Sequence, residues 1–149
     1  MKSIVSLFLT LSLAFAAQKS TQTVAVAGGM WPMPPLIQIW TDSKLVLMPK
    51  ASLSSMKNSV LLDFFPKLEM IQTSINDNEN IEELLKLNAH LYICHKAKGV
   101  LCEKLQKAGK NALNLGVNID NYNSKKTLAY WLENLAQYFP IEKKNKKLI

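Results

Sequence analysis

The chain has 149 residues, of which 48% are hydrophobic, with only 5 glycines and 6 prolines. This length corresponds to one domain, and this composition excludes an intrinsically disordered chain. The formal net charge is +7, and every one of the 18 basic residues is a lysine. Because the planar guanidinium of arginine is the preferred reader of bases and phosphates, the absence of arginine argues against nucleic-acid binding.

The first residues have the pattern of a secretory signal peptide. Lys2 precedes an apolar run over residues 4–15, and Ala14-Phe15-Ala16 matches the small-residue cleavage motif. The run is shorter than the stretch of about 20 apolar residues that spans a bilayer. We therefore expect residues 1–16 to be a signal peptide and the mature chain to be exported.

The first half of the mature chain alternates between strand and helix patterns. Residues 23–27 form a β-branched and alanine-rich run that Gly28-Gly29 closes, which predicts a buried parallel strand. The proline-rich stretch that follows predicts a rigid loop and a helix that begins near Pro34 or Pro35. The remaining patterns predict a strand over 45–47 stopped by Pro49, a helix that continues to Phe65 and is ended by Pro66, and a weak strand within 69–74.

The second half has the clearest pattern. It predicts a helix capped by Asn80 with Glu83, a strand over 89–94, a helix over 100–108 followed by Gly109, a strand over 112–115, and a long amphipathic helix from Asn123 or Ser124 to Pro140. This alternation predicts an α/β domain, a three-layer sandwich with a short parallel sheet of three or four strands. Ligands of such sheets bind on the loops beyond the carboxyl ends of the strands.

The order of these patterns resembles a known family. Residues 80–139, beginning "NIEELLKLNAHLYIC", look like the amino-terminal lobe of periplasmic binding proteins for metal chelates, and the likeness extends back through "TVAVAGGMWPMPPLIQIW". Ala89 and His90 depart from the pattern, because the family usually has Pro-Asp there. The residues that fit it are Asn80, Glu82, Leu84, Leu85, Leu87, Leu91 and Ile93.

The resemblance implies a Rossmann-like amino-terminal lobe of a helical-backbone periplasmic binding protein that serves an ABC importer. Its ligand would be an iron or nickel chelate of the siderophore, iron(III) dicitrate or cobalamin-like type. The receptor would be located in the periplasm and would have no permanently bound cofactor. It would deliver the ligand to an ABC transporter permease, and through this permease it would contact the inner membrane peripherally. Residues 17–140 would form the chelate-binding lobe and residues 141–149 the start of a truncated inter-lobe helix, so that the carboxyl-terminal lobe is missing.

Six residues on the loops that follow the strands are candidate ligand contacts: Trp31, Met33, Lys50, Ser52, His95 and Asn118. Trp31 and Met33 would form an apolar wall, although Trp31 could equally pack under the glycine turn. Lys50 and Ser52 would hold an anionic chelate, although Lys50 could simply be solvated. Asn118 would add a polar contact or merely form a turn.

His95 is the candidate metal contact, because neutral imidazole suits iron and nickel. One histidine cannot fill a coordination shell, so the metal would arrive chelated and His95 would take an open position. The alternative is a loop histidine without a ligand. Cys94 and Cys102 match no common zinc spacing and are expected to be inert thiols, with a disulfide as the alternative.

No catalytic motif is recognisable in the sequence, so we expect a binding protein and not an enzyme. The other function that remains open is a non-binding structural remnant of such a receptor, or an interaction or dimerisation module derived from it.

Overall fold

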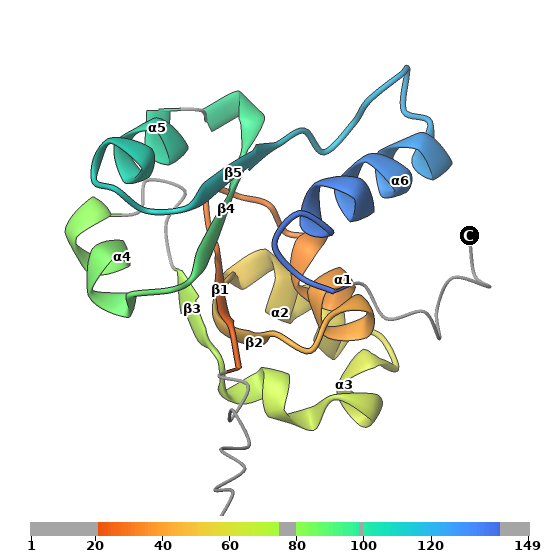
Figure 1. The fold of residues 1–149 in the computed structure, drawn as a ribbon. Coiled ribbons are helices and arrows are strands. Elements are labelled where there is room, and N and C mark those ends of the chain that lie inside the picture. The colour runs from red at the N-terminus through yellow and green to blue at the C-terminus, as the bar shows by residue number, and fades with distance from the viewer. Residues whose placement is uncertain (1–20, 75–79, 99, 141–149) are drawn as a thin grey trace, which may run out of the picture.

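The computed structural model describes residues 21–74, 80–98 and 100–140. The predicted signal peptide and the tail over 141–149 lie outside the described residues. Within them, one sheet of parallel strands has the order β3-β2-β1-β4-β5, as Figure 1 shows. The strands are β1 (Thr23–Val26), β2 (Lys44–Pro49), β3 (Gln72–Ser74), β4 (Leu91–His95) and β5 (Ala112–Leu115). The predicted α/β class is confirmed, with five strands in place of the expected three or four.

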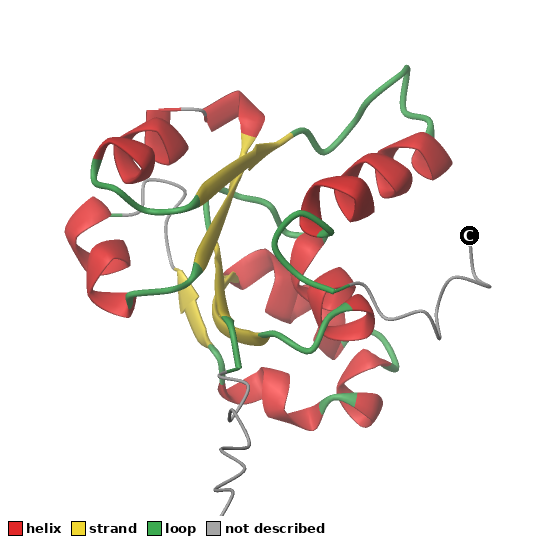
Figure 2. Cartoon of the chain, in the orientation of Figure 1, coloured by secondary structure: helices red, strands yellow, loops and turns green. Residues whose placement is uncertain are grey.

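The helices form a layer on each face of the sheet (Figure 2). One layer contains α1 (Met33–Trp40), α2 (Lys50–Lys57), α3 (Leu61–Phe64), the 3₁₀ helix η1 (Pro66–Met70) and α6 (Ser124–Leu135). The other contains α4 (Ile81–Leu87) and α5 (Val100–Lys107), and the short 3₁₀ helix η2 (Lys96–Lys98) leads into α5. None of the helices within the described ranges combines the length and apolar character needed to cross a bilayer.

Alternating side chains of the central strands build a separate core on each face. Val24 and Val26 of β1 belong to the core under α1 and α6, whereas Ala25 and Ala27 belong to the core under α4 and α5. Successive side chains of a strand point to opposite faces, so a central strand that is covered on both sides is apolar throughout. The small alanines leave room for Tyr92, whose buried hydroxyl donates to the Leu84 carbonyl oxygen at 2.8 Å.

The order of the strands creates a topological switch point between β1 and β4. From β1 the chain adds β2 and β3 on one side, and after α4 it returns to the other side of β1 to add β4 and β5. The connection that leaves β1 therefore turns to the α1 layer, and the connection that leaves β4 turns to the α5 layer. Such a divergence opens a crevice beyond the carboxyl ends of the two strands.

The helix predicted to continue to Phe65 is broken at residues 58 and 59. Asn58 ends α2, and the Ser59 hydroxyl donates to the Met56 carbonyl oxygen at 2.9 Å while accepting from the Leu61 amide at 3.2 Å. These polar side chains compete with helical backbone hydrogen bonds and restart the chain as α3. Pro66, expected only to end a helix, begins η1.

The last helix is also shorter than expected, because α6 ends at Leu135 and not at Pro140. The amides of Tyr138 and Phe139 both donate to the Leu135 carbonyl oxygen, at 3.0 and 2.9 Å, which closes the chain into a tight turn. This turn places Phe139, only 4% exposed, in the core. Asn80 and Asn123 are confirmed as N-cap residues, since each accepts a hydrogen bond from an amide in the first turn of the helix that follows.

Candidate ligand-binding site

The loop after β1 begins at the topological switch point. Gly28 and Gly29 have positive φ angles of 62° and 81°, a left-handed conformation that glycine adopts without a steric penalty. This turn directs the chain away from the strand end, and Trp31 at its tip remains 50% exposed. The structure therefore places the Trp31 ring at the surface of the carboxyl edge rather than in the core.

Met33 is not at this surface. The helix α1 begins at Met33, slightly earlier than the sequence indicates, and the methionine side chain is fully buried in the core shared with α6. A side chain without exposed surface cannot contact a ligand. The expectation that Met33 lines a ligand wall is therefore wrong for this structure.

The start of α2 holds the Trp31 loop in place. The Ser52 hydroxyl donates to the Trp31 carbonyl oxygen at 2.7 Å, and Ser52 is only 1% exposed. Ser52 therefore positions the loop. The expectation from the sequence, that its hydroxyl holds an anionic chelate, does not fit this arrangement. Lys50 is exposed in the first turn of α2, just beyond the carboxyl end of β2.

His95 is the last residue of β4 and lies directly beside the glycine turn. A Cβ atom built on Gly28 would lie 3.5 Å from the His95 backbone nitrogen. His95 pairs with Leu115 of β5, whose side chain belongs to the core under α1 and α6, so the strand alternation directs His95 to the same face as α1. Its Nδ1 atom accepts a hydrogen bond from the Ala97 amide at 2.9 Å.

A disulfide fixes the segment that contains His95. Cys94 at the end of β4 is bonded to Cys102 in the first turn of α5, with the two Cα atoms 5.9 Å apart. The expectation of two inert thiols is therefore wrong. The two residues are 0% and 1% exposed, and the bond closes the loop through η2 into a small ring.

The loop after β5 carries the remaining predicted residue, Asn118, which is exposed. Asp120, Asn121 and Tyr122 all have positive φ angles, between 49° and 65°, which is rare for residues other than glycine. Lys126 forms an ion pair with Asp120 and helps to hold this conformation.

Tyr122, on the same loop and 78% exposed, is a surface aromatic that the sequence placed beyond the carboxyl end of a strand but not among the candidate ligand contacts. In Figure 1 this loop projects beyond the end of β5 at the same edge of the sheet as η2. The sequence signal for this loop conformation is the Asp-Asn pair before Tyr122, because Asp and Asn tolerate the left-handed backbone conformation.

The described residues contain no group of three or more histidine, cysteine, aspartate or glutamate side chains arranged to hold a metal ion. A free metal ion would therefore not meet three such side chains together in this part of the chain. Four of the predicted residues are at least partly exposed at the carboxyl edge: Trp31 and Asn118 on loops, Lys50 at the start of α2 and His95 at the end of β4.

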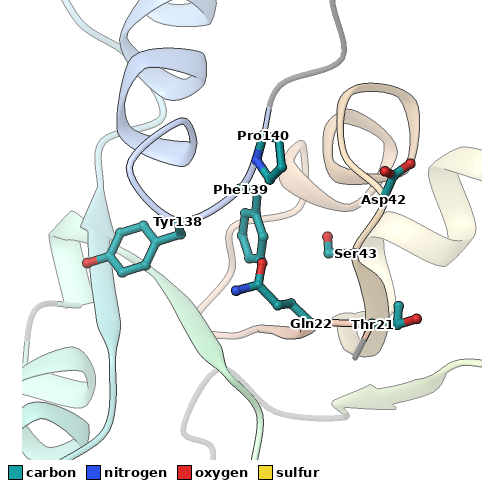
Figure 3. A pocket seen from close by; sticks show the side chains of 7 residues that line it. All are labelled: Thr21, Gln22, Asp42, Ser43, Tyr138, Phe139 and Pro140. Atoms are coloured by element: carbon teal, nitrogen blue, oxygen red, sulfur yellow. The ribbon is translucent and has the colours of Figure 1, made fainter. Parts of the chain in front are cut away.

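Two pockets lined by described residues lie at the opposite, amino-terminal edge of the sheet. Figure 3 shows the larger, about 460 Å³, where the Phe139 ring lies beside Gln22. Its lining residues are Thr21, Gln22, Asp42, Ser43, Tyr138, Phe139 and Pro140. A smaller pocket of about 260 Å³ lies between the segments that precede β4 and β5. Neither pocket contains a residue that the sequence predicted as a ligand contact.

Comparison with known proteins supports the fold. No protein-family model matches the chain, and no curated protein sequence matches it. Among solved structures, the chain is similar to a periplasmic solute binding protein from Veillonella parvula DSM 2008, with 21% sequence identity and a TM-score of 0.59. The similarity covers 80% of this chain but 38% of the solved one, so the chain spans well under half of that protein's length. At this identity the similarity shows a shared α/β fold.

Proposed function

We propose that the chain is one lobe of a periplasmic solute-binding protein that captures a chelated iron or nickel ion for an ABC importer. The observation that carries the proposal is the topological switch point between β1 and β4, with the half-exposed Trp31 on the loop after β1 and the partly exposed His95 at the end of β4. The similarity of the fold to a periplasmic solute binding protein supports it.

The chemistry of the carboxyl edge suits a chelate better than a bare ion. Trp31 offers an aromatic surface, Lys50 a cation, and His95 and Asn118 polar side chains. An organic chelator presents both apolar surface and anionic oxygens, and it supplies the coordination shell that the described residues lack. Delivery would then require contact with a membrane permease.

One lobe contacts one side of a ligand. Small-molecule sites normally bury about 70–90% of the ligand surface. The carboxyl edge of one lobe does not enclose a ligand to that extent. We therefore expect the lobe alone to bind its chelate more weakly than micromolar, and an opposing surface to raise the affinity.

Tryptophan fluorescence tests this proposal. Trp40 and Trp131 are 6% and 9% exposed, so a ligand at the carboxyl edge should change mainly the emission of Trp31. Ferric citrate and nickel with free histidine are titrated into the purified mature chain, with Trp31→Phe as the matched control. A saturable change that the control lacks supports the proposal. The absence of any saturable change up to millimolar chelate, or an equal change in the control, contradicts it.

A further inference from the structure

We propose that His95 recognises the chelate as a hydrogen-bond donor through Nε2 and does not coordinate the metal ion. This inference rests on the proposed function and specifies the ligand chemistry of the same site. The decisive contact joins the Ala97 amide to His95 Nδ1 at 2.9 Å. A backbone amide can only donate, so Nδ1 carries a lone pair and no proton. Neutral imidazole has one N–H group, which is therefore on Nε2.

This tautomer opposes metal coordination at either nitrogen. A metal ion binds a ring nitrogen through the lone pair of that nitrogen. In this tautomer only Nδ1 of the ring has such a lone pair, and it already accepts the hydrogen bond from the Ala97 amide. Coordination through Nε2 would require the proton to move to Nδ1. The Nδ1–H group would then face the Ala97 N–H, which removes one hydrogen bond and places two donors against each other.

The fold holds His95 in this tautomer. The Cys94–Cys102 disulfide ties together the two ends of the segment, and Gly28 packs against the His95 backbone. The short helix η2 begins immediately after His95, and the Nδ1 contact satisfies one of its first amides, which lack a partner within the helix. A change of tautomer would therefore also remove a cap from η2.

The charges at the carboxyl edge indicate which acceptor Nε2–H meets. Lys50 follows β2 and Lys96 follows β4, and both are exposed. Asp120, on the loop after β5, is already paired with Lys126. Two exposed cations and a fixed N–H donor favour anionic oxygens, so we infer that the ligand is a carboxylate-bearing chelate whose own groups fill the coordination shell of the metal.

The tautomer is measured first, on the ligand-free protein, by long-range proton–nitrogen NMR of the histidine rings. We expect the His95 proton on Nε2 and a hydrogen-bonded Ala97 amide. A proton on Nδ1 overturns the inference, whatever the protein binds.

The second measurement compares His95→Gln with His95→Ala in the binding of ferric citrate. Glutamine places an amide N–H near the position of Nε2–H but is a poor metal ligand, so His95→Gln should bind within about twofold of the wild type. His95→Ala should bind about tenfold more weakly, the effect of one hydrogen bond to a charged group.

Equal losses in both variants, or an iron absorption spectrum that changes on binding to the wild type but not to His95→Ala, indicate coordination and overturn the donor role. If ferric citrate and nickel–histidine both fail to bind, the proposed function fails and the role of His95 fails with it, although the tautomer result stands.

Discussion

Reduction of the Cys94–Cys102 disulfide should lower the free energy of unfolding by a predictable amount. The cysteines are separated by 8 positions, and both are buried in the core under α5. In the loop-closure model, a ring of this size removes about 8 cal/mol/K of entropy from the unfolded chain, which corresponds to about 2.5 kcal/mol at 25 °C. This is a large fraction of the net stability of a small domain.

Urea unfolding followed by circular dichroism, with and without reductant, measures this difference. The Cys94→Ala/Cys102→Ala double variant is the control, because its stability should not depend on reductant. A difference below about 0.5 kcal/mol between the oxidised and reduced chains would refute the reasoning, since the loop-closure term would then be absent. So would two thiols that react with a thiol reagent in the native, unreduced protein.

Five substitutions, which make three separate tests, examine the other structural assignments by the same unfolding measurement. Tyr92→Phe removes a buried hydroxyl that donates one hydrogen bond and accepts another, and should cost about 2 kcal/mol; a loss below about 0.5 kcal/mol would contradict the assignment. Met33→Ala should cost about 3 kcal/mol, because Met33 is fully buried, whereas Trp31→Ala should cost less than about 1 kcal/mol; the reverse order would show that the two roles are exchanged. Gly28→Ala should cost about 1 kcal/mol through its positive φ angle, with Gly116→Ala, which has no positive φ angle, as a nearly neutral control; equal costs would exclude the backbone as the cause.

Local patterns predicted most of the elements, because the signals are carried by neighbouring residues. The Val-Ala run over residues 23–27 predicts β1, and Asn80 and Asn123 predict the starts of α4 and α6. Each of these signals acts within one turn or one strand, where the sequence fixes the geometry. The order of the strands depends instead on pairing between distant segments, which no single stretch of sequence specifies.

The errors in the site prediction have the same origin. Met33 lies between Pro32 and Pro34 in a proline-rich stretch and was assigned to a loop, but α1 starts at Met33 and turns the side chain into the core. The separation of Cys94 and Cys102 in the sequence does not reveal the 5.9 Å between their Cα atoms, which depends on how α5 packs against β4. The hydrogen bond that fixes the His95 tautomer likewise depends on η2, which was not predicted.

The central claim is that the ligand binds at the carboxyl edge of the sheet. Amide chemical-shift mapping tests it most directly, with gallium citrate as a diamagnetic substitute for ferric citrate. The account predicts that the largest shifts occur over residues 28–31, 95–97 and 116–118. Shifts concentrated instead around Gln22, Ser43 and Phe139, which line the 460 Å³ pocket at the amino-terminal edge, would contradict it.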